Sequence, residues 1–148
     1  KRDEALAMIP RLGQDPEQLE AVIARVDEIR VLMSLQGISN LRATVLDTRG
    51  YALLKNQQPN LALMDLLVAA RLCDTEYHTM IVSIDRQRKL AVDPAPLDRY
   101  ARQMTRQLAV LLYHRSLVFD AVHQPARARE DRERIKEQLK LHPDQHLF

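Results

Sequence analysis

Apolar side chains recur at three- and four-residue steps through two long stretches, 59–92 and 96–122, and this periodicity constrains the fold most. Such spacing places side chains on one face of an α-helix. The first stretch contains Leu63, Leu66, Leu67, Ala70, Cys73, Tyr77, Met80, Ile81 and Ile84, and the second contains Leu97, Tyr100, Ala101, Met104, Leu108, Leu111, Leu112, Phe119 and Val122. Neither stretch has a clear breaker in its interior, so the pattern leaves open whether each is one long helix or two shorter ones.

Shorter helices are expected on both sides of these stretches. The sequence predicts a short piece around residues 6–12, a helix over 16–36 that starts at the Asp15-Pro16 pair, a helix after Asn40 that ends at the turn 56–60, and a polar outer helix over 126–141. The chain has only 3 glycines, no tryptophan and 4% aromatic residues, a composition typical of helices rather than of β-rich folds. We therefore expect an all-α fold of antiparallel helical hairpins.

Length and charge limit the class of protein. With 148 residues, 46% of them apolar and 28% charged, the chain fits one soluble domain that can bury a core, and no apolar run is long enough to span a membrane. The net charge of +2 is too small for a dedicated nucleic-acid binder. We expect a cytoplasmic protein, although the first residue is Lys1 rather than Met, which leaves open that an upstream segment has been removed.

An internal repeat is the strongest organisational signal. When the chain is shifted by 66 residues, 7 identities fall within 32 positions without a gap. The pairs are Ala43/Ala109, Leu46/Leu112, Arg49/Arg115, Gln58/Gln124, Pro59/Pro125, Ala62/Ala128 and Asp65/Asp131. These matches follow the order helix, turn, helix, and 66 is close to two units of a 34-residue period. The pattern predicts a repeat scaffold.

Residues 43–74 carry a more specific pattern of small and large side chains. Leu46 and Gly50 in the first helix, followed by Ala62, Leu66 and Ala69 in the second, resemble the tetratricopeptide repeat (TPR) family. Residues 109–141 fit the same pattern loosely, and 75–108 fit it poorly. The resemblance implies a single domain over 1–148, a short, degenerate TPR-like superhelix: N-terminal helices in 1–42, two units around a degenerate stretch and a tail at 142–148.

The resemblance also implies a function and a set of site residues. Members of the TPR family bind proteins or peptides, mainly on the surface formed by the first helix of each pair. The residues that would face that groove are Asp47, Tyr51, Leu54, Lys55, Tyr113, Leu117 and Asp120. The alternative is that neighbouring helices cover these side chains, Leu54 and Leu117 above all. We expect a non-enzymatic interaction or assembly scaffold with a protein or peptide partner.

Two functions of other classes remain open. The first is an RNA-associated helical domain that uses Arg86, Arg88, Lys89, Arg99, Arg102 and Arg106. The second is a self-associating or regulatory domain of a larger protein. Because no phosphate-binding loop, serine elbow or paired metal-ligand motif is present, no catalytic residue, metal site or cofactor is predicted.

Two packing hypotheses follow from the repeat. Gly50 and Ala62 are expected at a close helix crossing, because small residues let helix backbones approach. Arg49 precedes Asp65 by sixteen residues, and Arg115 precedes Asp131 by the same distance. These residues form either an ion pair inside each unit or four independent surface charges.

Overall fold

The computed structural model describes residue 24, residues 43–90, residue 93 and residues 95–143. Within these ranges the chain forms four α-helices and no strand: α3 (Ala43–Lys55), α4 (Pro59–Lys89), α5 (Ala95–Ala121) and α6 (Pro125–Glu137). The all-α prediction is confirmed. The helices expected before residue 43 and the tail beyond residue 143 lie outside the described residues.

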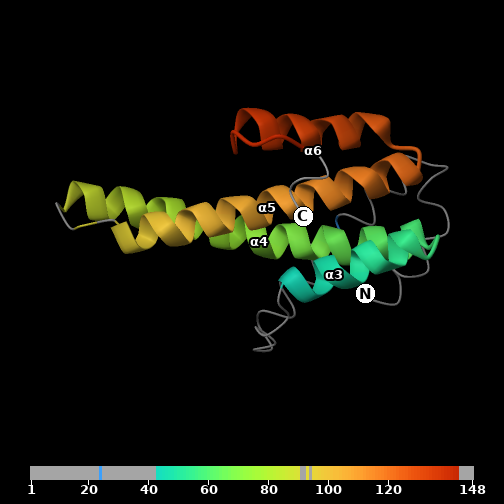
Figure 1. Cartoon of the computed structure of the whole chain (residues 1–148), viewed down its shortest axis with the longest axis horizontal. Helices are drawn as coiled ribbons and strands as arrows, with labels where there is room; N and C mark the ends of the chain where they lie inside the picture. Colours follow the sequence, from blue (N-terminus) through green and yellow to red (C-terminus); the bar gives the residue numbers. More distant parts are fainter. Residues whose placement is uncertain (1–23, 25–42, 91–92, 94, 144–148) are drawn as a thin grey trace.

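The helices form an up-and-down array in which consecutive helices are antiparallel neighbours (Figure 1). The periodicity left open whether each long stretch is one helix or two. The structure shows one helix in each: α4, with 31 residues, in stretch 59–92, and α5, with 27 residues, in stretch 96–122. At a rise of about 1.5 Å per residue, α4 is about 45 Å long, whereas the 13-residue α3 reaches only about 20 Å. Much of the α4/α5 hairpin therefore extends beyond the two short helices (Figure 1).

The core lies where all four helices overlap. Its largest fully buried side chains are Leu63, Leu66, Leu108, Leu111, Leu112, Val118, Ile135 and Cys73. Most of the periodic apolar residues of the two long stretches thus form one continuous core, as their spacing predicts. Ile81 and Tyr100 are the exceptions, because both side chains are exposed. Four polar residues are also buried, namely Asp65, His114, Ser116 and Asp131, and each requires hydrogen-bond partners to offset its desolvation.

The 66-residue repeat reappears as two matching turns. Gln57 and His123 both adopt the left-handed conformation, with φ of 59° and 61°. After α3 the Gln58 amide donates to the Leu53 carbonyl, and after α5 the Gln124 amide donates to the Phe119 carbonyl. This arrangement is the Schellman motif, which satisfies carbonyls at the helix end and reverses the chain. Each turn leads into a helix with proline in its first turn.

Of the two alternatives for these charged residues, the structure shows an ion pair inside each unit. Arg49 donates Nε and Nη2 to the two carboxylate oxygens of Asp65, at 2.6 and 2.7 Å. Arg115 makes the same two bonds to Asp131, at 2.9 and 2.7 Å. The hydrogen bond and the charge of Asp65 raise the pKa of the Arg49 guanidinium above its ordinary value. The alternative of four independent surface charges is wrong.

The predicted close crossing is also present. A Cβ atom added to Gly50 would lie 2.9 Å from Cγ of Leu66 and 3.3 Å from the carbonyl oxygen of Ala62. Ala62 itself is completely buried. Because real Cβ atoms essentially never lie as close as 2.9 Å to another atom, a larger residue at position 50 requires a shift of Leu66 or of the neighbouring helix.

Candidate functional site

Three of the residues expected in the groove form one stripe along α3. Asp47, Tyr51 and Lys55 are spaced by four residues, which places their side chains above one another on the same face of a helix. The Lys55 ammonium lies 5.1 Å from the centre of the Tyr51 ring, within the range of a cation–π interaction. Tyr51 is half-buried and Lys55 is exposed, so the stripe runs from the helix interface outward to solvent.

His114 of α5 connects this stripe to the second unit. Its side chain is buried, and its Nδ1 lies 2.6 Å from Oδ1 of Asp47. Because an ionised carboxylate only accepts hydrogen bonds, Nδ1 carries the hydrogen and donates it. The Tyr51 ring stacks on the imidazole, with centroids 4.4 Å apart and planes at 21°. Sequence reasoning missed this histidine, because 67 residues separate it from Asp47 and no local pattern links the two.

The expected residues on α5 divide into two groups. Tyr113 is half-buried, packs against the core and lies with its ring 6.3 Å from that of His114. Leu117 is half-buried one turn further along, whereas Asp120 is exposed and forms an ion pair with Arg132 of α6. The structure thus gathers the α3 stripe and Tyr113 around His114, and directs Asp120 toward α6. We call the cluster of Asp47, Tyr51, Lys55, Tyr113 and His114 the α3/α5 surface.

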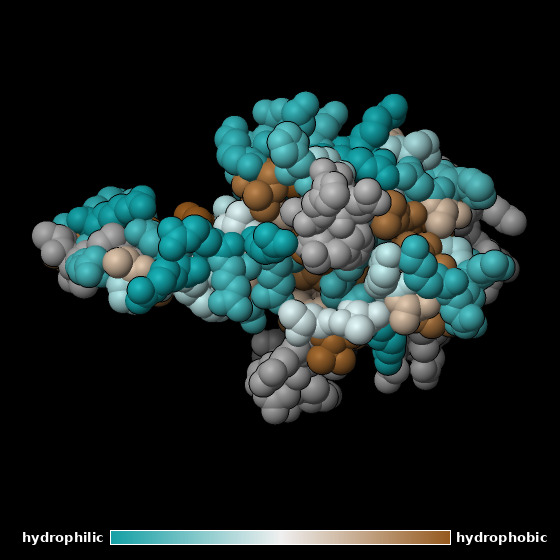
Figure 2. All heavy atoms as spheres, viewed as in Figure 1, coloured by the Kyte–Doolittle hydropathy of each residue, from teal (hydrophilic) through white to brown (hydrophobic). Residues whose placement is uncertain are grey.

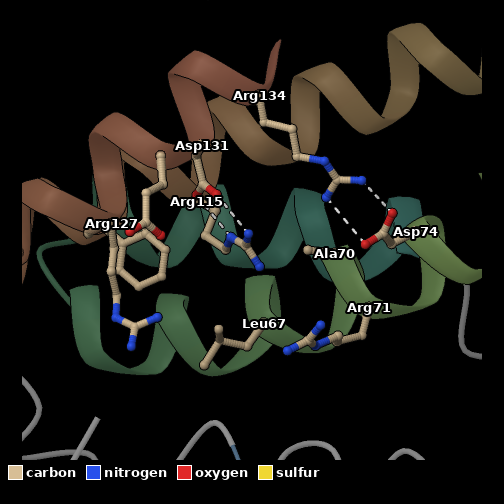
Figure 3. Close-up of a pocket in the computed structure, with 10 residues that line it drawn as sticks. Leu67, Ala70, Arg71, Asp74, Arg115, Arg127, Asp131 and Arg134 are labelled. Atoms are coloured by element: carbon tan, nitrogen blue, oxygen red, sulfur yellow. Dashed lines mark hydrogen bonds and ion pairs between the residues drawn. The ribbon is translucent and has the colours of Figure 1, made fainter. Parts of the chain in front are cut away.

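A hollow with a volume of about 230 Å³ lies between α4, α5 and α6 (Figure 3). Two arginine–aspartate pairs cross it. Arg115 faces Asp131 inside the second unit, and Arg134 of α6 reaches Asp74 of α4 at 2.5 and 3.2 Å. In both pairs the charges neutralise each other within the molecule. We therefore interpret this hollow as a polar contact between α6 and the long hairpin, and we call it the seam.

Nucleophiles and metal ligands do not gather at either feature. Cys73 is buried with its Sγ 3.9 Å from Sδ of Met104, and burial raises its thiol pKa to about 12. A thiol in that state is a poor nucleophile at neutral pH. Of the other described histidines, His78 is exposed near Asp74, His123 lies in the α5–α6 turn, and His142 is exposed beyond α6. Among the described residues no three metal-ligating side chains lie together.

The six basic residues named as a candidate RNA patch all lie toward the distal end of the long hairpin. Arg88 pairs with Asp98 across the two helices at 3.5 Å, and Lys89 pairs with Asp85 on α4 at 2.9 Å. The other four are Arg86, Arg99, Arg102 and Arg106, and all are exposed. The structure therefore places these six residues toward one end of the molecule, some distance from the α3/α5 surface (Figure 1).

Within the described ranges, none of the helices combines the length and apolar character needed to cross a bilayer. Comparisons with known proteins found no match: no family model matches the chain, and no curated protein or solved structure is significantly similar to it.

Proposed function

We propose that this chain is a non-enzymatic protein-interaction scaffold that binds a peptide segment of a partner on the α3/α5 surface. The observation that carries the proposal is the contact between Tyr51 and His114, which joins the first helices of two repeated units into one aromatic and polar face. Tyrosine pairs a large apolar ring with a polar tip and is enriched among residues that dominate binding energy at interfaces.

The repeated architecture supports this assignment. The close crossing at Gly50 and the two helix pairs, each joined by a matching turn, support the proposal. In that family the first helices of the units line the binding groove, and α3 and α5, which contain the first helices of the two predicted units, are neighbours in this molecule. A degenerate TPR-like array is therefore the reading that we propose for the chain.

The test is affinity capture from native lysate with mass spectrometry, followed by measurement of affinity for the partner that is recovered. Tyr51→Ala and Tyr113→Ala are each expected to weaken binding by roughly 2 kcal/mol, about thirtyfold. Because both tyrosines are half-buried, Tyr51→Phe is included, since it keeps the ring that stacks on His114. Lys55→Glu changes the surface charge without touching the core, and Lys136→Glu on exposed α6 is its matched control.

The outcomes separate a binding role from a packing role. Loss of the partner in Lys55→Glu and Tyr51→Ala, with Lys136→Glu unaffected and the helical circular-dichroism signal intact, supports the proposal. Normal affinity in a folded Tyr51→Ala/Tyr113→Ala double variant refutes it. A large fall in melting temperature with no separate effect on affinity assigns both tyrosines to the core.

A further inference from the structure

The side of α6 that faces the long hairpin is charged, like the side that faces solvent. In Figure 2 this helix lies at the top of the view and is mostly hydrophilic. Its charged residues that line the seam, at the three- and four-residue spacing of one helix face, are Arg127, Glu130, Asp131 and Arg134. Because charged groups inside a protein need partners to offset their lost hydration, the balance of charge in the seam decides what the hollow can hold.

The described lining of the seam contains more positive than negative charge. Arg115 pairs with Asp131, and Arg134 pairs with Asp74, so each of these two carboxylates has an arginine partner. The other charged side chains of the lining are Arg71, Arg127 and the exposed Glu130. Four arginines thus line the hollow against three carboxylates, and this excess favours an anion inside it.

Arg115 and Arg134 differ in how many of their nitrogens donate hydrogen bonds. All three nitrogens of Arg134 donate, two of them to Asp74 and one to Gln138. Arg115 donates through Nε and Nη2 to Asp131, and in the described part of the chain its Nη1 donates to no protein acceptor. Because the Arg115 side chain is only 17% exposed, an acceptor placed in the hollow is needed to satisfy Nη1.

This nitrogen of Arg115 faces the region of two further arginines. In Figure 3 it points away from Asp131, toward the side of the hollow on which the guanidinium groups of Arg71 and Arg127 lie. Guanidinium groups from three different helices therefore line one part of the seam. Such groups bind phosphate and carboxylate oxygens through charge-assisted hydrogen bonds, which are often bidentate.

We infer that the seam binds a small molecule that carries phosphate or carboxylate oxygens, at a site separate from the α3/α5 surface. Nη1 of Arg115 donates to one oxygen, and Arg71 and Arg127 contact the others. The volume of about 230 Å³ exceeds what one water needs and is below the range of about 300 to 1,000 Å³ for drug-sized ligands, so a compact anion fits it.

Water is the competing occupant of the hollow. Water molecules accept hydrogen bonds from Nη1 of Arg115 as an anion does, but they carry no charge to offset the excess of arginine. The two occupants therefore differ in one measurable respect, because only an anion site responds to the number of positive and negative groups around it.

Isothermal titration calorimetry of the full chain tests the inference, with pyrophosphate and citrate as probes and sodium chloride added to keep the ionic strength constant. We expect saturable one-to-one binding, and comparison of the two probes distinguishes phosphate from carboxylate recognition. Arg71→Gln and Arg127→Gln leave the Arg115–Asp131 pair in place, and each is expected to weaken binding about fivefold. Arg129→Gln removes an exposed arginine of α6 outside the hollow and is the matched control, with no expected change in affinity.

Asp131→Asn gives an independent readout. It removes a carboxylate that competes for Arg115, so the probe should bind about threefold more tightly and should raise the melting temperature of this variant more than that of the native chain. General stabilisation by phosphate salts would raise both equally. Absence of saturable binding, an affinity that Arg71→Gln and Arg127→Gln leave unchanged, or an equal loss in Arg129→Gln overturns the inference. Weaker binding to folded Asp131→Asn overturns it as well.

Discussion

Removing the Asp131 carboxylate is expected to cost more stability than removing the Asp65 carboxylate, although the two residues occupy equivalent positions of the repeat. Both carboxylates are buried and both accept two bonds from an arginine. The arginines differ, because the Arg49 side chain is 64% exposed and the Arg115 side chain is 17% exposed. The two equivalent arginine–aspartate pairs therefore lie in different dielectric environments within one molecule.

The expected magnitudes follow from what each arginine can do after the substitution. In Asp65→Asn, the exposed Arg49 recovers hydration, so the loss is about 1 kcal/mol, as for pairs near the surface. In Asp131→Asn, Arg115 remains inside the seam, where Arg127 and Arg134 also line the hollow. Removing one partner of a buried pair costs about 3 to 5 kcal/mol, and the residual exposure of Arg115 reduces this to about 2 to 3 kcal/mol.

Urea denaturation followed by circular dichroism measures both losses, and double-mutant cycles with Arg49→Gln and Arg115→Gln isolate the coupling within each pair. Asp85→Asn, which removes an exposed partner of Lys89, is the matched control and should change stability by less than about 0.5 kcal/mol. Equal losses for Asp65→Asn and Asp131→Asn, or a larger loss for Asp65→Asn, would refute the argument that burial of the arginine sets the magnitude.

Three further outcomes are expected. Gly50→Ala should lower stability by about 1 kcal/mol, because its clash with Leu66 outweighs the better helix propensity of alanine, and a rise in the urea midpoint would contradict this. Gln57→Gly and His123→Gly should each raise stability by about 0.5 to 1 kcal/mol in the same assay, because glycine adopts positive φ without strain; a loss at both would count against the turn geometry. Cys73 in the native chain should react slowly with thiol reagents and rapidly after unfolding. Its native pKa of about 12 lies above the unfolded value of about 8.5, so the stability that the protonated thiol contributes is complete below pH 8.5 and is lost as the pH rises toward 12. Cys73→Ala should remove this dependence of the unfolding free energy on pH.

Much of the local architecture could be predicted because it is encoded in neighbouring residues. The turn at Gln58-Pro59 and its equivalent at Gln124-Pro125 follow from proline at the start of a helix. The end of α6 was predicted less well: it stops at Glu137, four residues before the expected Leu141. That helix is polar nearly all round, so the periodicity that marks helix ends elsewhere is weak there.

The candidate site was predicted only in part. The α3 stripe of Asp47, Tyr51 and Lys55 followed from the TPR resemblance and lies together on one face. His114, which Asp47 and Tyr51 contact, was not among the residues expected at the site. The contact depends on how α3 crosses α5. Local sequence patterns do not predict a contact between residues that are 67 positions apart.

By itself the sequence determined the helices, their antiparallel order and the 66-residue repeat, because helical periodicity and turn chemistry act over a few residues. Only the tertiary structure decided that Arg115 is sheltered and Arg49 exposed, and that His114 joins the two units. These features depend on the relative lengths and crossings of helices distant in the chain, and burial and pairing are properties of the packed faces rather than of any one segment.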